Sequence, residues 1–296
     1  MQITRFVIAD IGLELSSQDD LPLMAVLPNF ENFYVENFPQ DIAVIRFELV
    51  EEEFVIVEQD YKLLSDISIV WGDNFKFMES VNSYVTVVDE LVRADDTLWV
   101  MESDKTFMSS KIYFDRKKIE SSTALSWLMM VAFGQASLRY DTALIHASVV
   151  IRDDQAVAFL GKSGTGKSTH SRLWVKHIPG FSLLNDDNPA IRVVDEENVV
   201  IYGTPWSGKT HCYVNKKASL ISLVRLQQAP YNRFTSKKGK DALMELLPSF
   251  TALRWNKEIF STMINLLENI INAVHVGHLD CLPDQDAAEL CYENIK

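Results

Sequence analysis

The stretch that decides the fold is Gly161-Lys162-Ser163-Gly164-Thr165-Gly166-Lys167-Ser168. It satisfies the pattern G-x-x-x-x-G-K-[ST], in which glycines let backbone amides turn inward around phosphate oxygens. The apolar run 155–160 before it predicts a buried strand, and the run 169–176 after it is compatible with a helix. We therefore expect the loop to open a helix N-terminus, whose partial positive charge favours a bound anion.

The residue types in this loop predict separate roles. Lys167 is expected to reach the β- and γ-phosphates of a nucleotide, and the Ser168 hydroxyl to ligate Mg²⁺. The alternative is a chance glycine-rich turn, which the flanking strand and helix patterns make the weaker interpretation. The expected nucleotide contacts are Gly161, Lys162, Ser163, Gly164, Thr165, Gly166, Lys167, Ser168 and Thr169.

A second strand pattern, Phe181 to Leu184, ends in Asn185-Asp186-Asp187-Asn188-Pro189. Mg²⁺ prefers oxygen ligands held near the phosphates, so carboxylates at the end of a strand downstream of a phosphate loop fit its coordination. One aspartate can hold the metal shell while the other accepts a proton from an attacking hydroxyl. Taken alone the run is typical of a hydrogen-bonded turn. Together with the loop it favours a catalytic pair.

The run Gly203-Thr-Pro-Trp-Ser-Gly-Lys-Thr210 matches the same loop pattern letter for letter. Pro205 has no amide hydrogen to offer phosphate, Trp206 is bulky, and the residues from Cys212 onward are typical of a strand rather than a helix. We therefore assign the nucleotide to the first match. Lys209 either reaches into the site from a neighbouring loop or is a solvated lysine, and the sequence favours neither.

The chain of 296 residues is long enough for two ordinary domains. We predict an N-terminal β-rich module, 1–118, and a domain with a phosphate loop and a helical C-terminal region, 119–296. Short β-rich runs between turn-like breaks indicate antiparallel pairing in the module. These runs are Ile3 to Ala9, Ile42 to Leu49, Phe54 to Val57, Ile67 to Trp71, Tyr84 to Val88, Thr97 to Met101 and Lys111 to Phe114.

Helical spacing over 122–138 predicts a core helix that joins the two parts. Strands 144–151 and 155–160 follow, separated by a short polar turn, which indicates a hairpin. A hairpin is unusual before a phosphate loop, where a doubly wound sheet places a crossover helix. It puts His146 on the strand beside the one that feeds the loop.

The composition, with 47% hydrophobic and 23% charged residues, is that of an ordinary globular protein. The net charge of −13 arises mainly in residues 1–120. An acidic chain without a basic run repels nucleic acid and anionic lipid, so we expect neither as a partner. Three cysteines without paired spacing, no signal-peptide pattern and no apolar run long enough to cross a bilayer favour a cytoplasmic protein.

Four stretches together resemble a known family. These are Ile145-His-Ala-Ser148, Phe159 to Thr169, Leu184 to Pro189 and Tyr202 to Gly208. They resemble the C-terminal domain of HPr kinase/phosphorylase, and more closely the HPr-kinase-related proteins that share its fold with ATP-dependent phosphoenolpyruvate carboxykinases. The resemblance covers roughly residues 140–226. It implies an α/β fold, with a nucleotide-binding core of mixed sheet, flanking helices and a β-hairpin before the phosphate loop.

The resemblance also implies roles for single residues. His146 matches the active-site histidine of the family, Lys167 the phosphate-binding lysine and Ser168 the Mg²⁺ ligand. Asp187 matches the residue that takes the proton from an acceptor serine, with Asp186 beside it near the metal. The implied cofactors are ATP and Mg²⁺, and the implied partner is a protein or peptide acceptor. Since HPr kinases form hexamers, a homo-oligomer is possible.

The sequence departs from the HPr kinases at two points. No acid stands within 199–202, where those enzymes carry a glutamate, and Arg233 is a weak counterpart of their catalytic arginine. Our leading hypothesis is an Mg²⁺-dependent kinase that moves the γ-phosphate of ATP to a hydroxyl, in particular a serine of a protein or peptide. The alternatives are a non-catalytic nucleotide-binding accessory or sensor protein and a small-molecule kinase.

Overall fold

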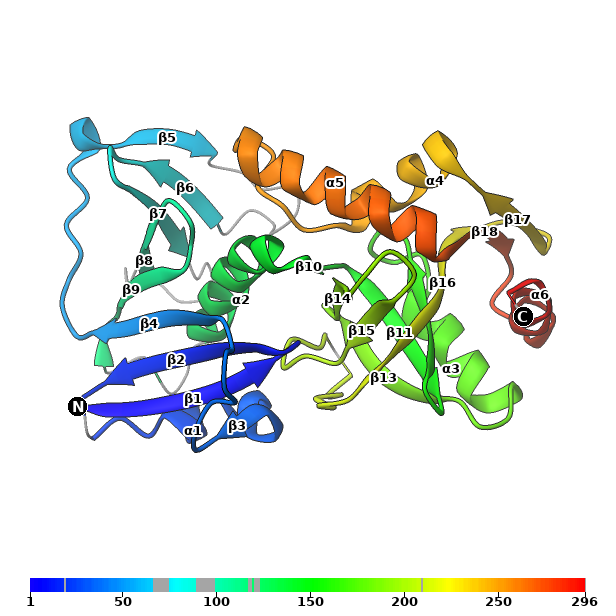
Figure 1. The fold of residues 1–296 in the computed structure, drawn as a ribbon, viewed down its shortest axis with the longest axis horizontal. Coiled ribbons are helices and arrows are strands. Elements are labelled where there is room, and N and C mark those ends of the chain that lie inside the picture. The colour runs from blue at the N-terminus through cyan, green and yellow to red at the C-terminus, as the bar shows by residue number, and fades with distance from the viewer. Residues whose placement is uncertain are drawn as a thin grey trace. The chain divides into compact units, whose positions relative to one another are not determined.

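The computed structural model, drawn as a ribbon in Figure 1, describes residues 1–18, 20–65, 75–88, 99–116, 119, 123–208 and 210–295. The chain divides into two compact units, Met1–Ala136 and Ser137–Lys296. The division falls after Ala136 rather than after residue 118, so the helix expected to join the two parts belongs to the first unit. No helix within the described ranges is long and apolar enough to cross a membrane.

The first unit is a sheet with few helices. Its elements are β1 (Gln2–Ile8), β2 (Ile11–Ser17), α1 (Leu23–Val26), η1 (Pro28–Phe33), β3 (Tyr34–Val35), β4 (Val44–Val50), η2 (Glu58–Asp60), β5 (Lys62–Ser65), β6 (Phe75–Glu79), β7 (Ser83–Val88), β8 (Trp99–Asp104), β9 (Ser109–Tyr113) and α2 (Ala124–Ala136). The strand order is β3-β1-β2-β4-β9-β8-β7-β6-β5. Helix α2 packs on β4, β7, β8 and β9 and is buried along almost its whole length.

The expected antiparallel pairing of this unit is wrong in its middle. Strands β2 and β4 pair in parallel, and so do β4 and β9. The chain leaves β2, crosses through α1, η1 and β3, and only then returns as β4, so the two strands run the same way. The strand expected at 54–57 is absent. The backbone of this segment is irregular, and the side chains of Phe54 and Ile56 pack against the apolar cluster of Val85, Val87 and Val100. The strand expected at 67–71 lies outside the described residues.

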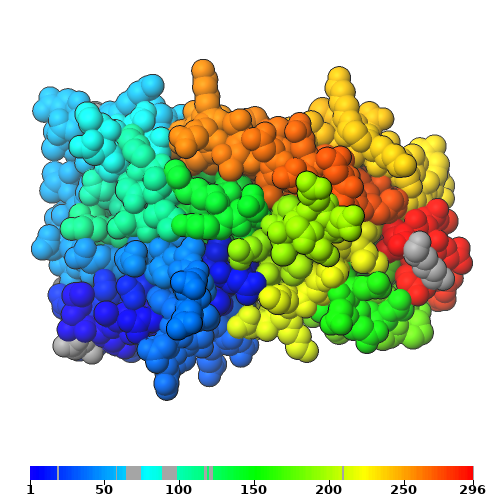
Figure 2. All heavy atoms as spheres, viewed as in Figure 1, coloured from blue at the N-terminus to red at the C-terminus, as the bar shows by residue number. Residues whose placement is uncertain are grey.

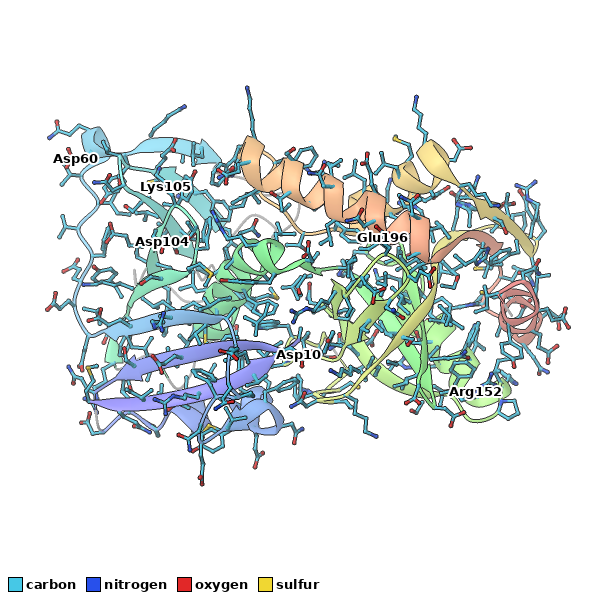
Figure 3. The ribbon with its side chains drawn as sticks, viewed as in Figure 1. Asp10, Asp60, Asp104, Lys105, Arg152 and Glu196 are labelled. Atoms are coloured by element: carbon cyan, nitrogen blue, oxygen red, sulfur yellow. The ribbon has the colours of Figure 1, made fainter. Side chains whose placement is uncertain are left out.

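The turn between β8 and β9 shows how polar side chains fix this sheet (Figure 3). The Asp104 carboxylate accepts hydrogen bonds from the amides of Thr106, Met108 and Ser109. The adjacent Lys105 donates to Glu79 at 2.8 Å and lies over the ring of Tyr84, 4.1 Å from its centroid. Asp104 therefore closes the hairpin, and Lys105 ties it to the β6–β7 hairpin next to it.

The second unit is a mixed sheet with helices on both faces. Its elements are η4 (Ser137–Tyr140), β10 (Thr142–Leu144), β11 (Ala147–Arg152), β12 (Gln155–Leu160), α3 (Lys167–His177), β13 (Ser182–Asp187), β14 (Ala190–Val193), β15 (Val199–Tyr202), β16 (Lys217–Gln228), β17 (Arg233–Lys237), α4 (Gly239–Leu246), η5 (Leu247–Ser249), α5 (Lys257–Ala273), β18 (His275–Cys281) and α6 (Gln285–Asn294). The strand order is β10-β14-β15-β16-β12-β11-β13, with β18 beside β16 and β17 beside β18.

Alternate residues of the central strands enter two separate cores, as the period of two along a strand requires. On β12, Ala156, Ala158 and Leu160 pack with α4 and α5, whereas Val157 and Phe159 pack with α3 and α6. Both faces of the sheet are therefore covered, which explains why β11 and β12 read as continuous apolar runs. Figure 1 shows α5 along one face, and Figure 2 shows its outer side and α6 at the surface.

The predicted hairpin before the glycine-rich loop is confirmed. Strands β11 and β12 pair antiparallel from Ala147 opposite Leu160 to Arg152 opposite Gln155, and Asp153 takes the left-handed conformation (φ 52°) that the tight turn requires. The Arg152 guanidinium, labelled in Figure 3, lies over the rings of Phe181 and Tyr292 at 4.5 Å and 5.3 Å. This contact fastens the hairpin to the start of β13 and to α6.

Candidate active site

Strand register brings the expected site residues to one edge of the sheet. Leu160, the last residue of β12, lies opposite Ala147, the first of β11, and Ala147 lies opposite Asp187, the last of β13. Because β11 runs antiparallel to both neighbours, the carboxyl ends of β12 and β13 and the start of β11 coincide. The glycine-rich loop, His146 and the Asp186–Asp187 pair therefore meet, although 41 residues of sequence separate His146 from Asp187.

The backbone of the loop depends on its glycines. Gly161, Gly164 and Gly166 have φ values of 150°, 81° and 100°, which side chains disfavour. Gly166 is the N-cap of α3, and the first helical hydrogen bond runs from the His170 amide to the Gly166 carbonyl at 2.8 Å. Within the described part of the chain, the amides of residues 166–169 donate to no protein acceptor. Unpaired amides at the start of a helix are the kind of donors that an anion requires.

Asp186 collects two hydroxyl groups. Its carboxylate accepts from Ser168 Oγ at 2.8 Å on Oδ1 and from Thr210 Oγ1 at 2.6 Å on Oδ2, and its side chain is buried. The Gly208 amide donates to the Asp186 carbonyl at 2.8 Å, which holds the 203–210 loop against the end of β13. The two matches to the loop pattern thus end on one carboxylate, with a serine from the first and a threonine from the second.

Asp187, His146 and Lys167 form a hydrogen-bonded chain. His146 Nδ1 lies 2.9 Å from Asp187 Oδ1, and His146 Nε2 lies 2.9 Å from Lys167 Nζ. An ammonium group only donates, so His146 Nε2 accepts and the proton of a neutral imidazole sits on Nδ1, where it donates to Asp187. Within the described residues no group donates to Asp187 Oδ2. One carboxylate oxygen is thus oriented by His146, and the other is not engaged by any residue that the structure describes.

Lys167 is the most buried cation of this cluster, with 8% of its surface exposed. Nζ donates to the Gly161 carbonyl at 3.0 Å and to His146. Burial lowers the pKa of Lys167, Asp187 and Asp186 oppose that shift, and Arg225 adds to it. Desolvation penalises an ammonium, so an anion bound beside Lys167 would relieve that penalty.

The residues around the aspartate pair hold it in place. Asn185 Oδ1 accepts from the Asp187 amide at 3.1 Å, and Asn185 Nδ2 donates to the Thr204 carbonyl at 3.2 Å. Thr204 Oγ1 in turn donates to the Asn188 carbonyl at 2.7 Å. Asn185 and Thr204 are fully buried, so the end of β13 is cross-linked to the 203–210 loop by satisfied polar groups.

Whether the site suits Mg²⁺ depends on the donor groups gathered around Asp186. One carboxylate and two hydroxyls supply only oxygen, and no cluster of three or more His, Cys, Asp or Glu able to hold a metal occurs among the described residues. Mg²⁺ is commonly bound by one or two carboxylates, with water and substrate phosphates completing its shell. The donors present fit Mg²⁺ in that manner and do not fit a metal that needs a full protein cage.

The remaining residues that the sequence singled out differ in where they lie. Lys162 and Ser163 are exposed in the loop, and Lys209 lies outside the described residues. Arg233 is on β17, where it donates to Asp280 Oδ2 at 2.7 Å, so its guanidinium is held in an ion pair with Asp280. The 203–210 segment is followed by no helix, as predicted, but the strand pattern from Cys212 onward is not realised there: residues 211–216 are irregular and β16 begins only at Lys217.

Two residues at the site were missed. Thr210 occupies the final Ser/Thr position of the second match to the loop pattern, and that position was the signal that could have identified it. His170 could have been found from its spacing to Trp174, one helical turn on, which places both rings on one face of α3.

No family model and no curated protein matches the chain. Among solved structures the chain is similar to the Hpr(Ser) kinase/phosphatase from Coxiella burnetii, with a TM-score of 0.30 and 13% identity, over 51% of this chain and 91% of that chain. The likeness is weak, and the chemistry below rests on the geometry of this chain.

Proposed function

We propose that the chain is an Mg²⁺-dependent phosphotransferase of the HPr-kinase-related kind, which moves the γ-phosphate of ATP to a serine hydroxyl of a protein or peptide. One observation carries the proposal. Lys167 and Ser168, adjacent at the start of α3, contact different members of the aspartate pair, Ser168 directly on Asp186 and Lys167 through His146 on Asp187. In this arrangement one carboxylate would hold the metal and the other would act as the base, and both would lie beside the same phosphate-binding loop.

The loop side of the site would bind the triphosphate. The free amides of residues 166–169 and the Lys167 ammonium supply donors for phosphate oxygens, and phosphoryl transfer depends chiefly on such positioning and charge neutralisation. Ser168 and Asp186 would hold Mg²⁺, which when bound neutralises charge on the β- and γ-phosphates. Lys167 would exchange its hydrogen bond to His146 for one to a phosphate oxygen.

Asp187 would act as the base. Its Oδ2 accepts no hydrogen bond from the described residues while Oδ1 is fixed by His146, so a hydroxyl placed at Oδ2 can transfer its proton to the carboxylate as it attacks phosphorus. His146 is partly exposed; its backbone amide donates to the Ser249 carbonyl at 2.7 Å, which anchors the main chain, and its ring is held by Asp187 and Lys167. We assign it the role of orienting the base.

The charge of the chain favours a peptide acceptor over a small anion. The acidic excess of residues 1–120 disfavours an anionic small acceptor. Small-molecule transfer and nucleotide binding without catalysis are the two competing functions, and the experiment below separates all three.

The test is transfer of label from γ-labelled ATP with Mg²⁺ into a lysate, which is then split into macromolecular and small-molecule fractions. We expect label in a discrete polypeptide, lost in Asp187→Asn and retained in Glu196→Gln. Glu196 is a matched control because it is an exposed carboxylate on the turn between β14 and β15, labelled in Figure 3. Label only in the small-molecule fraction would refute a protein acceptor, and binding of ATP without transfer would refute catalysis.

A further inference from the structure

A cavity of about 570 Å³ opens directly beside the glycine-rich loop. One wall is the loop and the first turns of α3, from Gly164 to Leu173. The opposite wall is formed by residues 226–230 at the end of β16 and residues 281–283 between β18 and α6. Strands β12, β16 and β18 are parallel, so their carboxyl ends lie at this same edge, where open α/β sheets bind ligands.

The cavity is large enough for a small organic group and mostly apolar. Its volume falls within the range typical of ligand pockets, about 300–1,000 Å³. The apolar lining comes from side chains on three segments, namely Leu173, Leu226, Pro230, Leu282 and Pro283. Because the loop itself is part of the lining, a phosphate chain held by the loop would lead into the cavity.

His170 is the one buried polar ring that lines this cavity within the described residues. It is 3% exposed, and Phe159 packs against it edge-on with centroids 4.7 Å apart. Trp174 Nε1 donates to His170 Nε2 at 3.1 Å. An indole nitrogen can only donate, so Nε2 carries no proton and the neutral ring bears its proton on Nδ1.

The Nδ1–H of His170 meets no acceptor among the described residues. Burial lowers the pKa of His170 to about 4, so the ring is neutral at pH 7 and the proton position follows from the Trp174 contact. Nδ1 is not one of the fully buried side-chain atoms that lack a partner in the described part of the chain, so it is accessible from the cavity, where a ligand or a water molecule can accept its proton. The ring therefore offers one fixed N–H donor to whatever fills the cavity.

We infer that this cavity binds the adenine base of the nucleotide, with His170 Nδ1–H donating to a ring nitrogen of the base. Adenine presents several ring-nitrogen acceptors to a single donor. Guanine presents an N–H and an amino group on one edge, which call for an acceptor such as a carboxylate, and the described lining contains no acidic side chain. Gln228, which also lines the cavity, donates through Nε2 to the Gly164 carbonyl at 3.2 Å and so links the wall at the end of β16 to the loop.

This inference rests on the proposed function, because it presumes that the loop binds a nucleoside triphosphate. The experiment measures dissociation constants by calorimetry for MgATP, MgGTP and Mg²⁺-tripolyphosphate, which has the phosphate chain without a base. Wild-type protein should bind ATP at least about tenfold more tightly than either of the others, the ratio that one well-placed buried hydrogen bond supplies.

Two variants probe the cavity separately from the loop. Ala229→Phe fills the cavity from a half-buried position, and His170→Phe keeps the ring while removing the donor. Both variants should raise the dissociation constant for ATP about tenfold and should change that for tripolyphosphate by no more than about twofold. Val194→Phe, an added ring at a position that is 58% exposed, is the control and should change neither constant. If His170→Phe does not fold, Ala229→Phe carries the test.

The outcomes are distinct. Equal affinity of the wild type for ATP, GTP and tripolyphosphate, or normal ATP binding by Ala229→Phe, would overturn the base cavity and leave the phosphotransferase proposal standing. Failure of the wild type to bind any of the three would overturn both.

Discussion

Acidification should destabilise the second unit through His170, and the size of the effect follows from its burial. Desolvation lowers the pKa of His170 from 6.5 to about 4. Between these values the unfolded chain binds a proton at this residue and the folded chain does not, so the free energy of unfolding falls as the pH falls. The stability is fully present above pH 6.5 and is lost progressively toward pH 4. At 1.36 kcal/mol per pH unit the loss is about 2 kcal/mol between pH 7 and pH 5, approaching about 3 kcal/mol near pH 4.

The assay is urea denaturation of wild type and His170→Gln at pH 7 and pH 5. Glutamine keeps an acceptor for the Trp174 indole and does not titrate, so the variant should lose about 2 kcal/mol less than wild type over this interval. Lys176→Gln, an exposed change on the same helix, should behave as wild type. Equal losses in wild type and His170→Gln would refute the assignment of a buried neutral histidine at this position.

Three further predictions concern the loop and the core. Thr210→Val removes the hydroxyl that donates to Asp186 Oδ2 and should raise the Mg²⁺ concentration needed for half-maximal ATP binding by about threefold or more. Thr262→Val, which removes a hydroxyl on α5, is the control and should leave that concentration unchanged. Both are measured by titrating ATP binding against Mg²⁺. Gly203→Ala places a Cβ against the Val214 carbonyl oxygen and should lower the thermal midpoint, and an unchanged melting curve would contradict the close approach. Leu267→Ala, fully buried on α5, should lose about 2–5 kcal/mol of unfolding free energy in urea, and a loss below about 1 kcal/mol would mean that α5 does not cover the sheet.

The local features of the second unit could be predicted from sequence. The β11–β12 hairpin was visible because a short polar turn separates two apolar runs, and α3 because helical residues follow Lys167. The approach of His146 to the loop followed from the hairpin alone, since a two-residue turn fixes which residues lie opposite each other.

What the sequence did not reveal depends on pairing between distant segments. The parallel register of β2 with β4 is set by the crossover between them, which leaves no periodic signal. The pattern at 54–57 has β propensity, but its residues pack without joining the sheet because propensity yields to tertiary packing. The hydroxyl of Thr210 reaches Asp186 only once the 203–210 loop is folded against β13.

The division of labour between the two aspartates is tested most directly by measuring ATP affinity against Mg²⁺ concentration, together with label transfer, in Asp186→Asn and Asp187→Asn. The geometry predicts that Asp186→Asn weakens Mg²⁺-dependent binding of ATP, because it removes the carboxylate held by Ser168 and Thr210. Asp187→Asn should bind ATP and Mg²⁺ as wild type does and transfer no label. Transfer by Asp187→Asn, or an equal loss of Mg²⁺ dependence in both variants, would contradict the assignment.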